Sequence, residues 1–355
     1  MKHMQSLQSF TGNPARRTGA KTALGLVAGV ALGLGVTSGA QEARADETFI
    51  LAHSMQTDHI FHPISEKFIE TLKGSAGDTL TVEYHPGGDL GDWTTLFEQS
   101  MQGAVPMTMA WGASDFDRRL DLGWLAYVVD NWEDAKKVYG PGGPMIEVFD
   151  TILKDLNLKL LGIIPTDFGS IAMRKGVTAV PVNYPDDAKG IKLRVPPVPI
   201  TIKRFEALGF SPVPIPFAET YTALQLGTVD ARATAPPVEI WQMRDVLESY
   251  ILTRDYFEVA YWVVNADWWG DLTEEQQAQI QAAADEAIAW SWEAAEKEGQ
   301  EFIEKAKGAG VNIVELTPEQ LANAKKILYE VEWPIMEEIV GPEIMTKMKA
   351  IRDTK

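Results

Sequence analysis

Short apolar segments alternate with amphipathic ones along this chain, and that alternation most constrains its fold. Residues 48–52, 79–84 and 105–110 carry apolar side chains in patterns typical of strands. Between them, residues 62–72 place apolar side chains at helical spacing, and residues 92–102 begin with aspartate, a residue type that caps helices. Regular alternation of strand and helix predicts an α/β fold built on a mainly parallel sheet.

The second half of the chain carries signals for longer elements. Residues 259–265 form an apolar run that predicts a buried strand. Residues 219–226 predict a helix, and Gly227 directly after them suits the left-handed conformation that ends many helices. Thr273 opens a capping-box pattern, so we expect one long helix over residues 273–307.

The N-terminal residues have the composition of an export signal. Cations that include Arg16 and Arg17 precede an apolar, glycine-rich stretch at residues 22–39, and Ala-Arg-Ala at 43–45 is a small-x-small cleavage pattern. We therefore predict cleavage after Ala45. The arginine pair indicates the twin-arginine route, with ordinary secretion as one alternative and an uncleaved anchor as another.

Charge and cysteine content exclude several classes of partner and site. The chain has a formal net charge of −18 and no cysteine. Such a charge repels nucleic acid and anionic lipid, so we expect neither as a partner. Disulfides, cysteine metal sites, thiol nucleophiles and lipoprotein acylation are excluded as well. The chain beyond residue 45 is longer than one ordinary core, which predicts two lobes in a free periplasmic monomer, not inserted in the membrane after signal cleavage.

Arg194 is the strongest candidate for a binding residue. It lies in residues 190–196, where an apolar strand ends in this cation followed by proline. In open α/β sheets the carboxyl ends of strands border the ligand crevice, and a guanidinium matches a carboxylate in charge and geometry. The ten positions after Arg194 contain no acidic residue, so a carboxylate from solution is the simplest partner. An ion pair that fastens a loop is the alternative.

Two stretches of this sequence resemble one family. Residues 190–196 read Gly-Ile-Lys-Leu-Arg-Val-Pro, and residues 214–230 read Pro-Ile-Pro-Phe-Ala-Glu-Thr-Tyr-Thr-Ala-Leu-Gln-Leu-Gly-Thr-Val-Asp. Both are similar to the extracytoplasmic solute-binding proteins of tripartite ATP-independent periplasmic (TRAP) transporters, of the C4-dicarboxylate and sialate receptor type. The resemblance implies a two-lobed, type II-like periplasmic binding protein fold with hinge strands and a long helix spanning the lobes. It places lobe I at residues 46–168 plus 260–299 and lobe II at residues 169–259 plus 300–355.

The resemblance also implies which residues bind the ligand. The arginine that matches Arg194 binds the ligand carboxylate, and the aromatic that matches Phe217 packs on the ligand. Thr234 stands where the family more often has asparagine, so it offers a hydroxyl in place of an amide. Trp111, after the strand at 105–110, and His53 are expected to form the wall from the other lobe.

Two other arginines bear on the number of carboxylates in the ligand. Ile171 stands where sialate-type members carry a second arginine, and Arg174, three residues later, is expected to face away from the cleft. Arg232 is expected to be a solvated surface residue. A ligand with a single carboxylate therefore fits better than a dicarboxylate.

The resulting hypothesis is a binding protein and not an enzyme, without a cofactor or metal. The resemblance implies that it captures a small organic acid and delivers it to a membrane permease driven by a sodium or proton gradient. The alternative is a periplasmic metal-assisted hydrolase that uses the same cleft, with His53, His59 and His62 as metal ligands. The sequence has neither a HExxH pattern nor a cysteine to support that alternative.

Overall fold

A computed structural model describes residues 46–177, 181 and 183–353 of this chain. The predicted export signal lies outside these residues. The described residues belong to one compact unit. Among them, no helix is both long enough and apolar enough to cross a bilayer.

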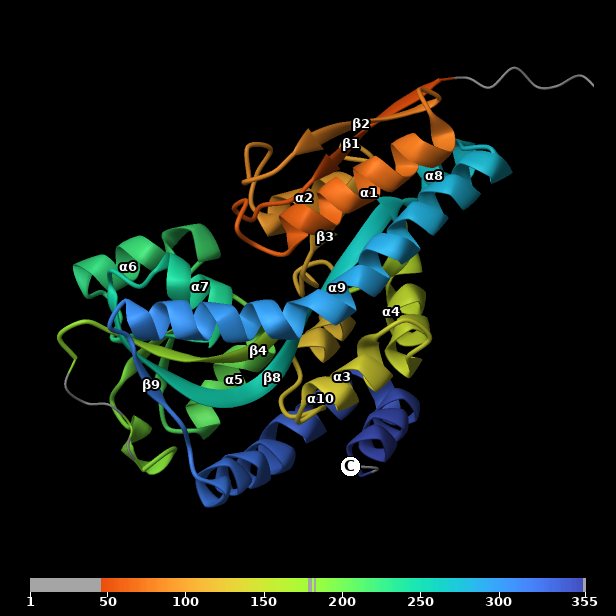
Figure 1. Ribbon diagram of the computed structural model, residues 1–355. Coiled ribbons are helices and arrows are strands. Elements are labelled where there is room, and N and C mark those ends of the chain that lie inside the picture. The colour runs from red at the N-terminus through yellow and green to blue at the C-terminus, as the bar shows by residue number, and fades with distance from the viewer. Residues whose placement is uncertain (1–45, 178–180, 182, 354–355) are drawn as a thin grey trace, which may run out of the picture. The chain divides into compact units, whose positions relative to one another are not determined.

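The described residues form nine strands in one sheet, with helices packed around it (Figure 1). The strands are β1 (Glu47–Ala52), β2 (Leu80–His85), β3 (Met107–Ala110), β4 (Leu158–Arg174), β5 (Lys192–Val195), β6 (Ser211–Pro214), β7 (Ala231–Ala235), β8 (Leu247–Asn265) and β9 (Asn312–Val314). The α-helices are α1 (Phe61–Ala76), α2 (Trp93–Met101), α3 (Trp132–Tyr139), α4 (Pro144–Lys154), α5 (Pro199–Ala207), α6 (Thr220–Leu226), α7 (Pro237–Gln242), α8 (Ala266–Asp271), α9 (Glu274–Gly308) and α10 (Pro318–Asp353). Three short 3₁₀ segments complete the set, η1 (Arg118–Trp124), η2 (Asp186–Ala188) and η3 (Phe217–Glu219).

Local signals in the sequence place several helix ends correctly. The Asp92 side chain accepts a hydrogen bond from the backbone N–H of Thr95, at 2.8 Å, and so caps α2. Thr273 and Gln276 form the predicted capping box at the start of α9. Gly227 ends α6 with a φ of 70°, in the left-handed region as predicted.

The sheet is mixed, which corrects the prediction of a mainly parallel one. Its order is β2-β1-β3-β8-β4-β7-β5-β6, and β9 also pairs with β8. The outer pairs, such as β1 with β2 and β5 with β6, are parallel. The β4–β8 ladder at the centre is antiparallel, as are the pairs that β3 and β7 make with it. The alternation of strand and helix holds only within each lobe, because the two central strands run across both.

The two long central strands connect the lobes. The strands β1, β2 and β3 lie on one side of this central pair and β5, β6 and β7 on the other, and we call the two sides the first and the second lobe. The first lobe joins the far end of β8, where β3 pairs with residues 261–264, whereas β7 pairs with residues 170–173 near the end of β4. The β4–β8 ladder changes register at four places, and the shift between Pro165 and Asp167 lies between these attachments. Such bulges bend a ladder locally, so this one lies where the ladder passes from lobe to lobe.

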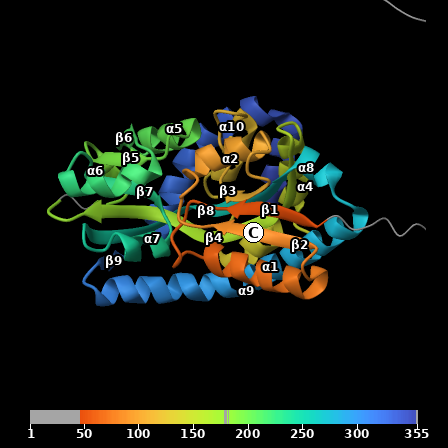
Figure 2. The same ribbon diagram turned by 90° about the horizontal axis from the view of Figure 1, so that it is seen from above.

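Helices cover both faces of the sheet. Figure 2 shows α1 and α9 on one side of the strands, and α2 and α5 on the other. The long helix α9 contacts α1, β4 and α7, so it touches elements of both lobes. Its glycine at position 299 lies against β4, at Asp167.

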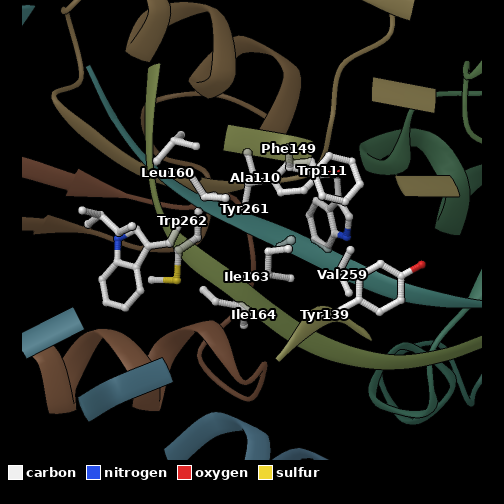
Figure 3. Close-up of a cluster of buried hydrophobic side chains, with 14 of the residues drawn as sticks. Ala110, Trp111, Tyr139, Phe149, Leu160, Ile163, Ile164, Val259, Tyr261 and Trp262 are labelled. Carbon is white, nitrogen blue, oxygen red and sulfur yellow. The ribbon is translucent and has the colours of Figure 1, made fainter. Parts of the chain in front are cut away.

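The largest hydrophobic core is built around β3, β4 and β8 (Figure 3). Its fully buried side chains include Ala110 on β3, Ile164 on β4 and Trp262 on β8. These strands are buried on both faces, so they carry nearly continuous apolar runs, as expected of a covered sheet. The core therefore holds the end of β3 rigidly, directly before Trp111.

Candidate functional site

A small cavity lies where the two lobes meet the central ladder, and it brings together most of the predicted site residues. It has a volume of about 30 Å³, so a molecule larger than a few waters requires its walls to move apart. The first lobe contributes residues at the start of α2, after β3 and at the end of η1, and the second lobe contributes residues near the ends of β5 and β7. The lining residues are Trp93, Trp111, Trp124, Arg194, Pro196, Phe217, Arg232, Thr234, Glu239 and Glu258.

Arg194 is the buried cation of this cavity. It is only 2 % exposed, on β5 near the carboxyl end of the strand. Its one hydrogen bond to the described residues runs from Nε to the carbonyl oxygen of Ile215, at 2.9 Å, and none of their carboxylates forms an ion pair with it. Burial, followed by repulsion from Arg232, lowers the pKa of Arg194 to about 9, so the guanidinium stays charged at neutral pH. A buried charge of this kind needs a partner.

Arg232 lies in the same cavity, which corrects the prediction that it is solvated. It is 1 % exposed because β7 is a central strand whose five residues are all buried. Its Nη2 donates to the carbonyl oxygen of Thr234, at 3.2 Å, and pairs with Glu239, while its guanidinium lies 5.8 Å from the centre of the Phe217 ring. Its Nε is buried without a hydrogen-bond partner. The cavity therefore has a second cation, already neutralised by the protein.

Two buried glutamates complete the polar wall. One oxygen of Glu258 is hydrogen-bonded to the Tyr256 hydroxyl at 2.5 Å, and the other is hydrogen-bonded to the Thr166 hydroxyl at 2.6 Å. Burial, followed by the nearby charge of Glu239, raises the pKa of Glu258 to about 8. Glu258 is consequently mostly protonated at pH 7. The Arg232–Glu239 pair is neutral as a unit, so the charge of Arg194 gives the cavity a net charge of +1.

Three tryptophans form the opposite wall. The rings of Trp93 and Trp111 meet edge to face with centres 6.1 Å apart, and those of Trp93 and Trp124 lie 6.4 Å apart. The indole N–H of Trp124 donates to the carbonyl oxygen of Gly112, at 3.2 Å. The indole N–H of Trp111 is buried and has no partner. The wall is therefore apolar except for one unsatisfied donor.

Phe217 and Thr234 lie on the second-lobe side of the cavity, as the sequence predicted. Thr234 has a φ of 52°, which is unfavourable for a β-branched residue. Strained positions of this kind cluster at functional sites. Phe217 begins η3 and is partly exposed, so it is accessible from the cavity.

The structure does not place His53 at the cavity, and the reason is its own hydrogen bonds. Its Nε2 is 2.8 Å from the Tyr84 hydroxyl, and its Nδ1 accepts from the backbone N–H of Met55 at 3.3 Å. Burial lowers the pKa of His53 to about 4, so the ring is neutral. Both ring nitrogens are occupied within the first lobe, and no ligand is needed to satisfy them.

The histidines predicted for the hydrolase alternative do not form a metal site. His62 Nδ1 binds the same Tyr84 hydroxyl, at 2.8 Å, and His59 is fully buried. Across the described part of the chain, no three side chains of His, Cys, Asp or Glu are grouped so that they could hold a metal ion. Arg174, expected to miss the cleft, binds the Val229 carbonyl at 3.1 Å and does not line the cavity.

Sequence reasoning missed six of the lining residues. Trp93 could have been found, because it follows the capping residue of a predicted helix at the strand end that borders the crevice. Glu239 follows Arg232 by seven residues in an apolar setting, a spacing that could have indicated a buried pair. The other missed residues are Trp124, Pro196, Arg232 and Glu258.

Comparisons with known proteins agree on the family. The family model described as bacterial extracellular solute-binding protein, family 7, matches residues 51–337. The C4-dicarboxylate-binding periplasmic protein DctP of Rhodobacter capsulatus is 26 % identical, over 80 % of this chain and 84 % of its own length. The 2,3-diketo-L-gulonate-binding periplasmic protein YiaO of Escherichia coli is 26 % identical, over 71 % of this chain and 76 % of its own.

A solved structure adds the fold. A TRAP periplasmic solute-binding protein from Ochrobactrum anthropi, whose C-terminus occupies its ligand-binding pocket, has a TM-score of 0.77 and 26 % identity. The match covers 88 % of this chain and 96 % of that one. This chain therefore has the two-lobed fold expected from the resemblance, and the family consists of binding proteins. The chain therefore belongs to family 7 of the bacterial extracellular solute-binding proteins.

Proposed function

We propose that this protein captures a small organic acid with one carboxylate and delivers it to the membrane permease of a TRAP transporter. The observation that carries the proposal is Arg194, a buried cation in the interlobe cavity without a carboxylate partner among the described residues. A bidentate carboxylate would supply the missing charge and accept from the free Nη groups. The relatives named for C4-dicarboxylate and for 2,3-diketo-L-gulonate support an organic acid as the ligand class.

Ligand capture would use the two lobes as a clamp. We place lobe I at residues 46–168 plus 260–299 and lobe II at residues 169–259 plus 300–355, so that both hinges fall within β4 and β8. Trp111 and Arg194 then reach the cavity from opposite lobes. A ligand touches both only when the lobes are closed, so it shifts the population toward the closed state. Micromolar affinity requires about 8 kcal/mol, which one buried charge pair and a packed aromatic wall can supply.

The proposed route to the periplasm is a cleaved export signal that ends at Ala45. Arg16 and Arg17 partly match a twin-arginine signal, and the twin-arginine pathway and ordinary secretion are the two alternatives for export. We further propose that the mature protein works as a monomer without nucleic acid. The formal net charge of −18 on the full chain opposes contact with other polyanions.

Binding of defined acids tests the site assignment. Succinate, galactonate, benzoate and phenylglyoxylate would be titrated calorimetrically into the wild type, Arg194→Gln and Arg174→Gln. For any acid that binds to the wild type, we expect Arg194→Gln to lower the affinity at least about thirtyfold, because the substitution removes one partner of a buried charge pair. Arg174→Gln removes the same charge outside the cavity, so it should bind like the wild type. Undiminished affinity in Arg194→Gln would refute the assignment.

A further inference from the structure

We propose that the cavity selects a monocarboxylate that is rich in hydrogen-bond acceptors and poor in donors, on a flat apolar body. An aryl 2-oxo acid is the simplest molecule of this class. Hydroxyl-rich sugar acids are disfavoured. The inference rests on the proposed function, since it takes the Arg194 cavity to be the ligand site, and it adds which acids that site prefers.

Two residues that line the cavity carry buried donors without acceptors. The indole N–H of Trp111 and the Nε of Arg232 are both buried and unpartnered, and they come from opposite lobes. Arg194 uses only its Nε within the protein. An unsatisfied buried donor costs about 1–3 kcal/mol, so a ligand that brings acceptors gains this energy back. A carboxylate satisfies Arg194, and a second oxygen acceptor on the ligand is needed for the other two donors.

The acceptors of the cavity are already in use. Both oxygens of Glu258 are held in hydrogen bonds with Thr166 and Tyr256, and Oε2 of Glu239 is held by Arg232. Three of the four carboxylate oxygens at the cavity are therefore engaged. A sugar acid carries a hydroxyl on nearly every carbon, and each hydroxyl must donate to something when buried. Few of its hydroxyl protons would find an acceptor here.

The walls favour a flat apolar body. Three indole rings, the Phe217 ring and Pro196 enclose the cavity, and the tryptophans touch one another edge to face or at a tilt. Aromatic walls of this kind pack well on a planar ring, which buries much area without requiring polar partners.

The charge of the cavity limits the ligand to one carboxylate. Arg194 is the unpaired cation, whereas Arg232 is neutralised by Glu239. A second ligand carboxylate would displace Glu239 or lie beside it, and like charges in a buried site repel strongly. A ketone oxygen accepts hydrogen bonds from Trp111 and Arg232 without adding charge.

A matched series of acids tests the selectivity. Phenylglyoxylate carries a carboxylate, a ketone and a phenyl ring; mandelate replaces the ketone with a hydroxyl, and benzoate lacks that second oxygen. Galactonate represents the sugar acids. By calorimetry at pH 7 we expect phenylglyoxylate to bind about tenfold tighter than benzoate, which leaves a buried donor unsatisfied, and about tenfold tighter than mandelate, whose hydroxyl brings a donor without an acceptor. Galactonate should bind most weakly, because it brings the most hydroxyl donors.

Two tryptophan variants distinguish the effect of the indole N–H on binding from the effect of the aromatic ring. Trp111→Phe keeps a flat wall but removes the free N–H. The affinity for phenylglyoxylate should therefore fall about tenfold, while the affinity for benzoate should change by less than about twofold. Trp124→Phe removes an N–H that already binds Gly112, so any loss should be similar for both acids. Circular dichroism would verify that both variants are folded.

The outcomes distinguish this inference from the proposed function. Tighter binding of galactonate than of phenylglyoxylate, abolished by Arg194→Gln, overturns the acceptor-rich class and leaves the carboxylate site standing. Equal effects of Trp111→Phe on phenylglyoxylate and benzoate overturn the role of the indole donor. Binding of phenylglyoxylate that survives Arg194→Gln refutes the proposed site, and the selectivity argument with it.

Discussion

Two buried arginines in this protein have opposite surroundings, and replacing each by methionine should change stability in opposite directions. Arg204 is fully buried and saturated: Nη1 binds Asp255 at 2.9 Å, and Nε and Nη2 bind Glu332 at 3.0 and 2.8 Å. Arg194 is 2 % exposed and has one hydrogen bond, to the carbonyl of Ile215. The substitution is chemically the same at both sites, so the difference isolates the effect of pairing.

The expected magnitudes follow from these contacts. Arg204→Met leaves two buried carboxylates without their cation, which should lower the free energy of unfolding by about 3–5 kcal/mol. Arg194→Met loses one hydrogen bond from a charged donor, worth about 1.5–3 kcal/mol. It also removes the burial of an unpaired guanidinium, which costs several kcal/mol, and the repulsion from Arg232. The sum should raise the free energy of unfolding by about 1–2 kcal/mol.

Urea denaturation of the unliganded proteins at pH 7, followed by circular dichroism, measures both changes. The wild type and the two variants should unfold with similar dependence on urea, so that midpoints report stability. The Arg194→Met variant must be more stable than the wild type, although it no longer binds the acids that the wild type binds. A loss of stability comparable to that of Arg204→Met would show that the Arg194 charge is satisfied by the protein itself, and the reasoning for a ligand carboxylate would fail.

Two further changes test the buried polar groups. The pKa of Glu258 is raised to about 8 from its ordinary value of 4.5, so the protonated group stabilises the fold fully below pH 4.5, and this contribution is lost as the pH rises through 8. Glu258→Gln should therefore flatten the fall in urea midpoint between pH 5 and 8, and an unchanged slope would contradict the assignment. Gly299→Ala would place a Cβ 1.8 Å from an Asp167 oxygen, so it should cost about 1–3 kcal/mol, whereas Gly74→Ala, with open space around it, should stabilise α1 by about 0.5–1 kcal/mol. Equal thermal midpoints for the two glycine variants would refute this packing.

The parts of the fold that sequence predicted depend on contacts between residues close in the chain. The Asp92 cap, the Thr273 capping box and the Gly227 helix end each join groups within a few residues, so residue type and spacing suffice to identify them. The strand at 48–52 was likewise found from its own composition, as β1. The antiparallel centre of the sheet was not, because pairing between β4 and β8 joins residues about a hundred positions apart.

The candidate site was predicted in part for the same reason. Residues on a recognisable motif, Arg194 and Phe217, lie at the cavity, as does Trp111 at a strand end. Arg232 was predicted to be a solvated surface residue, whereas β7 is covered on both faces. The small residues around it, Ala-Arg-Ala-Thr-Ala, would have been the better signal, since alanines flank a charge where neighbouring strands pack closely.

The acids nearby in sequence are weak grounds for deciding which partner an arginine has, and Arg204 shows why. Glu206 lies two residues after Arg204 but pairs with Lys203, whereas the partner Glu332 lies 128 positions away, where no local pattern could reveal it. No acid lies nearby in sequence after Arg194, and there the structure does leave the guanidinium without an ion pair to a described carboxylate. The identity of the partner matters most for a buried arginine, because a buried charge must be neutralised by the protein or by a ligand. What distinguishes a ligand site from a structural ion pair is thus the set of contacts in the folded protein, and Arg194 is the buried arginine of this cavity that forms no ion pair with a described carboxylate.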